Sequence, residues 1–342
     1  MSSPDKLRVL VVDDSAFARK VLREALSLSP ALEVVGTARD GLEALEKIAE
    51  LKPDVITLDL IMPNLDGLGV LRALPPAGGP RVVVVSISDS DSALCIEALQ
   101  MGAADLVQKP TALATDRLYE LSGEVVAKVI AAGAARRQPA GPLPTVSVLP
   151  AAAGGVRLVV IGTSTGGPQA LTRLLTAFPG DLPCAVAVAL HIPAGYTEAL
   201  ARRLDEACAV RVFEASDGAQ LVPGSVAIAR GGMHLRIRAE GPLILAEVNA
   251  QPLNSRFYPS VDILFESAAD SLGSAALGVV LTGMGNDGVI GARALHNKGG
   301  RILTESEGSC VVYGMPRAIV EAELSAGEAL IEHMADAILR HL

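Results

Sequence analysis

The chain has 342 residues, enough for about two domains, and 50% of them are hydrophobic, which is sufficient for sizeable cores. Aromatic residues make up only 3% and Trp is absent, so aliphatic residues must fill these cores. This composition favours buried parallel strands flanked by helices over an aromatic-rich β-sandwich. The formal net charge of -9 argues against nucleic acid as a partner, because nucleic-acid binding needs a basic surface.

Neither the cysteines nor the N-terminus indicates export or membrane insertion. The four cysteines, Cys95, Cys184, Cys208 and Cys310, form no CxxC pair, so we expect free thiols in a reducing compartment. The N-terminus lacks a basic region followed by a long apolar run, and no segment approaches the roughly 18 apolar residues of a membrane helix. We therefore expect a soluble, cytoplasmic protein, and a monomer because no heptad repeat is present.

Strands and helices alternate over the first part of the chain, which predicts a parallel, doubly wound sheet. An apolar run at 7–12 predicts the first strand, and two aspartates follow it. The other strands are expected at 32–36, 55–58, 82–86 and 105–107, and the helices at 15–28, 41–51, after Asp66, at 90–101 and at 116–131. Asp14 or Ser15 is expected to cap the first helix at its N-terminus.

A change in composition separates this pattern from a second one. Residues 134–155 are rich in Ala, Pro and Gly, lack an apolar period and contain too many prolines for a helix. We therefore expect one domain at 5–130, a linker at 131–155 and a second domain at 156–342.

The second domain also reads as α/β, with a mostly parallel sheet. Its buried strands are expected at 156–162, 184–190 and 277–283, and its helices at 169–178, 197–206, 261–271 and 289–298. Short β-like segments near Val210, Val226, His234 and Leu243 could pair as hairpins, and a further helix is expected at the C-terminus.

Three carboxylates follow strands of the first domain: Asp13, Asp14 and Asp59. The carboxyl ends of parallel strands meet at one edge, so these groups would repel one another unless a hard divalent cation such as Mg²⁺ bound them. Asp59 is then a candidate nucleophile toward a phosphoryl group. Ser86 and Lys109, at the next two strand ends, could bind that group. A single aspartate would more often be a helix cap, but this set at four strand ends favours phosphoryl chemistry.

The first 130 residues resemble the response-regulator receiver family, through VVDDS, LDLIMPNLDG, VVVVS and the KP pair that begins at Lys109. The resemblance implies a flavodoxin-like fold and a histidine kinase as phosphodonor. It also implies that Asp59 is phosphorylated, that Asp13 and Asp14 help to bind Mg²⁺, and that Ser86 and Lys109 sense the phosphate. The family usually has an aromatic residue where this chain has Leu106, which puts an aromatic switch in doubt.

The sequence GTSTGGP at 162–168 lies between a predicted strand and a predicted helix. It fits the GxSxG pattern, in which a strand-to-helix turn exposes a nucleophile, here Ser164, and the helix N-terminus faces the developing oxyanion. A glycine-rich turn before a helix could equally cradle a phosphate, although the Gly-Lys-Ser/Thr of a Walker A motif is absent.

A serine nucleophile needs a base and a group that orients the base. His191 follows the strand at 184–190, and Asp287 follows the strand at 277–283, so both should lie at the same edge as Ser164. The alternatives for the acid are Asp217 and Asp262, which more often would serve a turn and a helix N-cap respectively. Among the other histidines, we expect His296, His333 and His341 to be ordinary surface or cap residues, while His234 is ambiguous.

The second domain resembles the catalytic domain of chemotaxis protein-glutamate methylesterases, the CheB family. The motifs are IGTSTGGPQAL, HIPAGYTEALARRL, AIARGGMHL, YPSVDILFES, LTGMGNDGVIGARAL and VVYGMPRA. The resemblance implies a triad of Ser164, His191 and Asp287, and an oxyanion site near Thr165 and Met284, with no cofactor for the hydrolase. The departures are Ile192, where the family often has Met, and Arg230, where proline is usual.

The two resemblances together imply a phosphorylation-regulated enzyme of sensory adaptation. It would hydrolyse glutamate methyl esters and deamidate certain glutamines on methyl-accepting chemotaxis receptors, and the unphosphorylated receiver would block the active edge. Three alternatives remain: a response regulator with a non-enzymatic output such as DNA binding, a small-ester hydrolase with a vestigial receiver, and a CheB-like esterase of a non-motility pathway.

Overall fold

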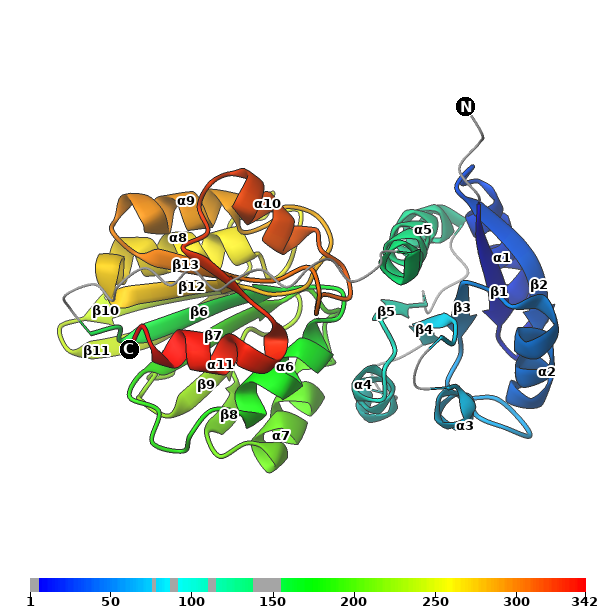
Figure 1. The fold of residues 1–342 in the computed structure, drawn as a ribbon, viewed down its shortest axis with the longest axis horizontal. Coiled ribbons are helices and arrows are strands. Elements are labelled where there is room, and N and C mark those ends of the chain that lie inside the picture. Colours follow the sequence, from blue (N-terminus) through cyan, green and yellow to red (C-terminus); the bar gives the residue numbers. More distant parts are fainter. Residues whose placement is uncertain (1–5, 76–77, 87–91, 110–114, 138–154) are drawn as a thin grey trace. The chain divides into compact units, whose positions relative to one another are not determined.

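The computed structural model describes residues 6–75, 78–86, 92–109, 115–137 and 155–342. The chain divides into two compact units between Gln138 and Pro139, and each unit is described by itself (Figure 1). Most of the predicted linker, 138–154, lies outside the described residues, as do residue 5 and the expected start of a helix at 90.

The N-terminal unit is built on a five-stranded parallel sheet with the order β2-β1-β3-β4-β5. Its strands are β1 (Leu7–Val12), β2 (Leu32–Ala38), β3 (Val55–Leu58), β4 (Arg81–Ser86) and β5 (Asp105–Gln108). Its helices are α1 (Ala16–Ser27), α2 (Gly41–Leu51), α3 (Gly67–Ala73), α4 (Ser92–Gln100) and α5 (Thr115–Arg137). Helix α1 packs against α5, while α2, α3 and α4 pack in succession. The predicted doubly wound sheet is confirmed.

Two local details of this unit refine the sequence analysis. Of the two expected caps, Ser15 is the N-cap of α1, where its hydroxyl accepts a hydrogen bond from the backbone N–H of Ala18. Helix α5 continues to Arg137, past the expected end at 131 and into the segment predicted as a linker. The physical reason is that residues 131–137 contain no proline, and Pro139 is the first residue that excludes helix before it.

The C-terminal unit contains a seven-stranded parallel sheet with the order β14-β13-β12-β6-β7-β9-β8. Its strands are β6 (Leu158–Thr163), β7 (Ala185–Leu190), β8 (Arg211–Glu214), β9 (Ser225–Ile228), β12 (Ala276–Val280), β13 (Arg301–Glu305) and β14 (Gly327–Ala329). The strands β10 (His234–Glu240) and β11 (Leu243–Asn249) form a separate antiparallel hairpin. The predicted α/β class and the hairpin are therefore both found.

Helices cover both faces of this sheet (Figure 1). They are α6 (Gly167–Thr176), α7 (Thr197–Ala207), α8 (Val261–Leu272), α9 (Val289–Asn297), α10 (Met315–Glu321) and α11 (Ile331–Leu339), with a short 3₁₀ turn η2 (Gly273–Ala275). Helix α6 packs against α7 and α11, and α8 packs against α9 and β10. The chain runs outward from β6 in both directions, so the switch point of the sheet lies beside β6, where parallel sheets bind their ligands.

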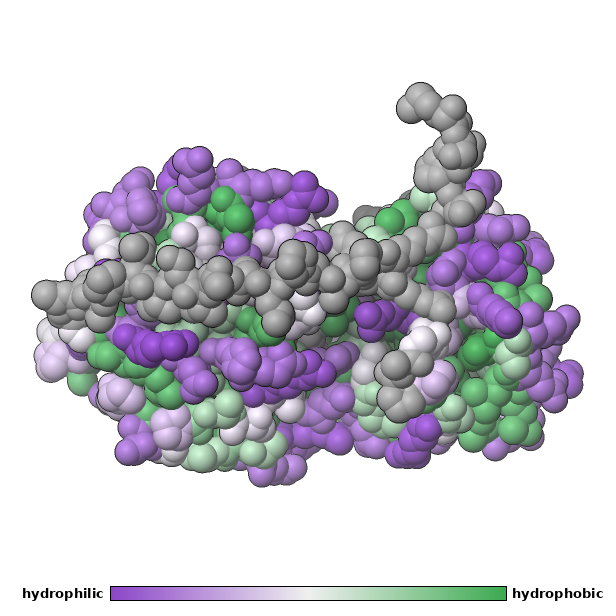
Figure 2. Space-filling model, viewed as in Figure 1, coloured by the Kyte–Doolittle hydropathy of each residue, from purple (hydrophilic) through white to green (hydrophobic). Residues whose placement is uncertain are grey.

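The core is aliphatic, as the composition predicts. Strands β6, β7 and β12 are buried along their whole length, and valine, leucine, isoleucine and alanine dominate the buried residues. On the face that Figure 2 shows, hydrophilic residues alternate with smaller hydrophobic areas in both units. Within the described ranges, no helix is long and apolar enough to span a membrane.

Candidate functional sites

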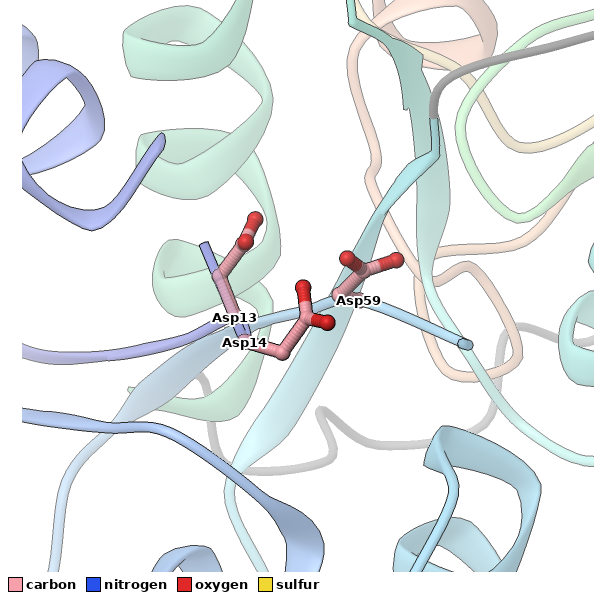
Figure 3. Close-up of side chains that lie close together, drawn as sticks. All are labelled: Asp13, Asp14 and Asp59. Atoms are coloured by element: carbon pink, nitrogen blue, oxygen red, sulfur yellow. The ribbon is translucent and has the colours of Figure 1, made fainter. Parts of the chain in front are cut away.

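The three aspartates of the N-terminal unit lie together at one edge of its sheet (Figure 3). Asp13 and Asp14 follow β1, Asp59 follows the neighbouring strand β3, and each offers an oxygen within 4.8 Å of the others. Asp13 and Asp59 are buried, whereas Asp14 is exposed. Three carboxylate oxygens with one side open to solvent fit the needs of Mg²⁺, which prefers oxygen ligands and keeps several waters.

Lys109 is the counter-charge of this cluster. Its Nζ lies 2.6 Å from Oδ2 of Asp13 and 2.7 Å from Oδ2 of Asp59. Burial raises the pKa of Asp13, and the ammonium of Lys109 opposes that shift only in part. The site therefore holds more negative charge than one lysine neutralises, which favours a bound cation.

Ser86 and Lys109 are neighbours across two adjacent strand ends. Ser86 ends β4 and is buried, and its carbonyl accepts a hydrogen bond from the backbone N–H of Lys109. Leu106 lies within β5 beside Val84 and is 1% exposed. The side chain of Leu106 is therefore packed inside the unit, and it is not aromatic.

In the C-terminal unit, Ser164 directly follows β6 and precedes α6. Its backbone N–H donates to the carbonyl of Thr282, which follows β12, at 3.1 Å. Glycine is required at position 283, because a Cβ there would lie 2.9 Å from Cβ of Ser164 and 2.4 Å from Sδ of Met315. Gly166, the N-cap of α6, has a φ of 81°, which also favours glycine.

Thr282, two residues after β12, is hydrogen-bonded to the turn around Ser164. The hydroxyl of Thr163 donates to the carbonyl of Thr282 at 2.7 Å, and the hydroxyl of Thr282 donates to the carbonyl of Thr165 at 3.0 Å. The backbone N–H of Thr282 donates to the buried carboxylate of Glu305 at 2.8 Å. The roles of Thr282 and Glu305 could not be predicted from the sequence: Thr282 lies in the motif LTGMGNDGVIGARAL but its bonds to the turn depend on the pairing of β12 with β6, and Glu305 lies in no recognised motif.

His191 and Asp287 are in direct contact. His191 follows β7, and its Nε2 lies 2.7 Å from Oδ2 of Asp287, in the segment between β12 and α9. The backbone N–H of His191 donates to the carbonyl of Thr163, which places it beside the turn of Ser164. Among the hydrogen bonds that the structure describes, none joins the hydroxyl of Ser164 to His191. Such bonds often tighten only when substrate binds.

The carboxylate of Asp287 is held by more than His191. It accepts hydrogen bonds from the backbone N–H groups of Val261 and Asp262 at 2.7 and 3.0 Å and from the hydroxyl of Ser260 at 3.0 Å. Burial alone would raise the pKa of Asp287, but His191 and these amides outweigh it and lower the pKa to about 2. Because this value lies below the ordinary 3.8, the stabilisation that Asp287 contributes is present above about pH 4 and is lost as the pH falls toward 2.

Phe257 covers the imidazole of His191. The two rings are stacked, with centroids 4.2 Å apart and an interplanar angle of 7°. The guanidinium of Arg256 lies 5.3 Å from the centroid of the Phe257 ring. The positions of Arg256 and Phe257 could not be predicted from the sequence, since the segment between β11 and α8 carries no periodic pattern that places it over the end of β7.

The weaker candidates for the acid serve other purposes. Asp217 accepts a hydrogen bond from the backbone N–H of Val248 at 3.0 Å. The N-cap of α8 is Ser260, whereas Asp262 lies in the first turn of that helix and accepts hydrogen bonds from Gly288 and Gly291 at the start of α9. Asp262 therefore caps a helix other than its own.

The remaining histidines divide into buried and exposed ones. His234 is buried in β10, its Nδ1 accepts a hydrogen bond from the N–H of Ser260, and burial lowers its pKa. His234 thus supports the loop around Asp287. His296 and His333 are exposed, in line with the expected surface or cap residues, whereas His341 is buried and lies just beyond α11 and its C-cap Arg340, so it is neither a surface residue nor the cap.

Four further residues were singled out from the sequence: Thr165 and Met284, expected near the oxyanion, and Ile192 and Arg230, which differ from the residues usual in the family. Thr165 is buried in the turn after Ser164, and Met284 is half-buried between Gly283 and Gly285. Ile192 is 6% exposed and packs inside the unit. Arg230 is exposed, with its Nε 3.9 Å from Glu214.

Two sheets of this topology, one with three clustered aspartates at its edge and one with a serine, a histidine and an aspartate at its switch point, are what a receiver joined to a hydrolase-like domain would show. The family described as response regulator receiver domain matches residues 9–120, and the family described as CheB methylesterase matches residues 159–338. The chain belongs to the CheB methylesterase family.

Full-length relatives agree with this assignment. The chain is 61% identical, over the whole of both chains, to a Myxococcus xanthus protein named protein-glutamate methylesterase/protein-glutamine glutaminase 5. It is 44% identical to a Symbiobacterium thermophilum protein of the same name without a number, over 98% of this chain and 96% of the relative. The crystal structure of the Thermotoga maritima CheB methylesterase catalytic domain matches 55% of this chain and 100% of its own, with 33% identity and a TM-score of 0.54.

Proposed function

We propose that this chain is a protein-glutamate methylesterase and protein-glutamine glutaminase acting on methyl-accepting chemotaxis receptors, with its activity controlled by phosphorylation of Asp59. The observation that carries the proposal is the contact between His191 and Asp287 beside the turn that bears Ser164, at the switch point of the sheet. The names of the full-length relatives supply the substrate class.

In the proposed reaction, the hydroxyl of Ser164 attacks the carbonyl carbon of the γ-glutamyl methyl ester. His191 accepts the hydroxyl proton on Nδ1, the ring nitrogen that does not contact Asp287, and passes it to the leaving methanol. Water then hydrolyses the acyl-enzyme and regenerates Ser164. With a glutamine substrate the same steps release ammonia.

Asp287 orients the imidazole and stabilises its protonated form during each transfer. The carboxylate remains ionised at neutral pH, since its pKa is about 2. Backbone amides near Thr165 and Met284 are proposed to bind the oxyanion, in keeping with their places after the ends of β6 and β12.

In the N-terminal unit, Asp13, Asp14 and Asp59 would hold Mg²⁺, which neutralises the charge that gathers when a phosphoryl group approaches carboxylates. Asp59 attacks the phosphoryl group, supplied by a chemotaxis histidine kinase, and Lys109 and Ser86 bind the phosphate oxygens. We also propose a cytoplasmic monomer without a nucleic-acid partner, in line with the acidic net charge of -9.

The test of the hydrolytic assignment is methanol release from methylated chemoreceptor membranes by the wild-type protein and by Ser164→Ala. We expect a loss of release on the order of 10³-fold or more in the variant, because the nucleophile is removed. Near-wild-type release from a folded Ser164→Ala protein would overturn the assignment. Hydrolysis of free small esters without any release from receptors would instead favour a small-ester hydrolase.

A further inference from the structure

Two aspartates of the C-terminal unit each hold the start of the helix that belongs to the other. Asp287 lies two residues before α9, yet its carboxylate accepts the backbone N–H groups of Val261 and Asp262, at the start of α8. Asp262 lies in the first turn of α8, yet its carboxylate accepts the N–H groups of Gly288 and Gly291 at 2.9 and 2.8 Å, at the start of α9. The two helix starts are therefore interlocked.

This interlock fixes Asp287 from two sides. The N–H of Asp262 bonds to Oδ1 of Asp287, while the carboxylate of Asp262 holds the N–H of Gly288, the residue that follows Asp287. Rotation of the Asp287 side chain and displacement of its backbone would each break one of these bonds. The bond from His191 to Oδ2 of Asp287 depends on the same geometry.

The carboxylate of Asp262 also places a negative charge beside the carboxylate of Asp287. Burial raises the pKa of Asp262 to about 6, and the proximity of Asp287 adds to the shift. The other titratable groups here are His191, which contacts Asp287, and His234 on β10, whose pKa is lowered by burial. The positive charge of Arg236 on β10 lowers the pKa of His234 further. At neutral pH Asp262 therefore carries negative charge next to the pair of His191 and Asp287.

We propose that Asp262 is a positioning residue of the hydrolase: its carboxylate holds Asp287 against His191, and its negative charge strengthens the imidazole as a base. The proposal rests on the proposed function, in which His191 receives the proton of Ser164. A carboxylate that served only as a helix cap would be replaceable by asparagine, which presents the same acceptor oxygen to Gly288 and Gly291.

The experiment compares wild-type protein, Asp262→Asn and a matched control, Asp205→Asn, all as the full chain. Asp205 is exposed on α7 and accepts one backbone N–H, from Val212 at 2.7 Å, so the control removes the same charge and a similar capping group elsewhere. The first readout is the rate at which a fluorophosphonate labels Ser164 between pH 5 and pH 9. The second is the proton NMR resonance of the His191 Nε2–H that bonds to Asp287.

We expect Asp262→Asn to be labelled about tenfold more slowly than wild-type protein at the plateau of the pH profile. We also expect the acidic limb of the profile to move to lower pH, because a negative charge near an imidazole favours its protonated form and Asp262→Asn removes that charge. The resonance of the Nε2–H should shift. Asp205→Asn should match wild-type protein in both readouts: in the plateau and acidic limb of the labelling profile and in the resonance.

Wild-type labelling and an unmoved acidic limb in Asp262→Asn would overturn the proposal and leave Asp262 as a helix cap. Slower labelling with an unmoved limb would overturn it as well, since it would indicate a packing defect. If Ser164 of the wild-type protein is not labelled at all, the proposed function fails, and the resonance alone decides on Asp262: an unchanged resonance in Asp262→Asn contradicts the proposed effect of the Asp262 charge on the pair of His191 and Asp287.

Discussion

At the scale of single residues, the proposed base is covered on one side by an aromatic ring. Phe257 stacks on His191 at 4.2 Å and limits the rotation of the imidazole, whose Nε2 is already held by Asp287. Stacked rings of this kind contribute about 0.5–1.5 kcal/mol beyond the burial of their surface. The contact therefore bears on the orientation of His191 as well as on packing.

We predict that Phe257→Leu lowers the kcat of methyl-ester hydrolysis about tenfold, because leucine fills part of the space but does not hold the plane of the imidazole. Phe257→Tyr keeps the ring and should retain most of the activity. Steady-state kinetics on methylated receptor, with the unfolding transition of each variant as a control for folding, checks both. Equal kcat values for the leucine variant and wild-type protein would show that the stack has no catalytic consequence.

Much of the site at this scale could be predicted from the sequence, and the physical reason is the sheet. Ser164, His191 and Asp287 each follow an apolar run that reads as a buried strand, and the carboxyl ends of parallel strands meet at one edge. Phe257 could not be predicted, because its place over His191 depends on the path of an irregular segment. The catalytic roles of the three residues stay predictions.

At the scale of elements, the segment after β12 and the turn after β6 approach each other so closely that position 283 has no room for a side chain. We predict that Gly283→Ala destabilises the C-terminal unit by about 1–3 kcal/mol and lowers kcat, because the new Cβ would push against Met315 and Ser164. Gly155→Ala is the matched control, since no heavy atom lies within 4 Å of a Cβ there. Chemical unfolding and methanol release measure the two effects. An unchanged Gly283→Ala variant would mean that the turn can move without loss.

The burial of Asp262 between the starts of α8 and α9 should make the free energy of unfolding depend on pH. The pKa of Asp262 is about 6 in the folded protein against an ordinary value of 3.8, so the folded state binds the proton more tightly. Asp262 therefore lowers the free energy of unfolding as the pH rises from about 4 to about 6, and the loss persists above that range.

We predict that Asp262→Asn lacks this pH dependence and gains stability relative to wild-type protein between pH 4 and pH 7. Urea unfolding of the C-terminal unit at several pH values measures the difference, with Asp205→Asn as the control for the removed charge. A difference between variant and wild-type protein that does not change with pH would contradict the account of this carboxylate.

Some strands and helices could be predicted from the sequence and others could not. Strands such as β6 and β7 were evident because they are continuous apolar runs, whereas β13, α10 and β14 were not predicted. β13 has only two apolar residues, Ile302 and Leu303, and β14 has only three residues, so neither forms an apolar run, while the seven residues of α10 are too few to show a helical period. The end of α5 was placed too early because its last residues are rich in alanine and were assigned to the proline-rich segment that follows.

At the scale of the whole molecule, the chain joins a receiver domain to a CheB methylesterase domain, and we propose that phosphorylation of the first controls the activity of the second. The acidic cluster of Asp13, Asp14 and Asp59, with Lys109 in contact, has the charge and the oxygen ligands that phosphorylation requires. The domain boundaries at 130 and 155 and the blocking of the hydrolase by the unphosphorylated receiver stay predictions. The segment 156–342 alone should be more active than the unphosphorylated full chain if blocking occurs.

Control of the hydrolase through Asp59 can be measured as methanol release from methylated chemoreceptor membranes, with and without a small-molecule phosphodonor and Mg²⁺, for wild-type protein and Asp59→Asn. We predict that the phosphodonor raises release by the wild-type protein and leaves release by Asp59→Asn at its basal level. An equal rise in both proteins, or no rise in either, would contradict control of the hydrolase through Asp59.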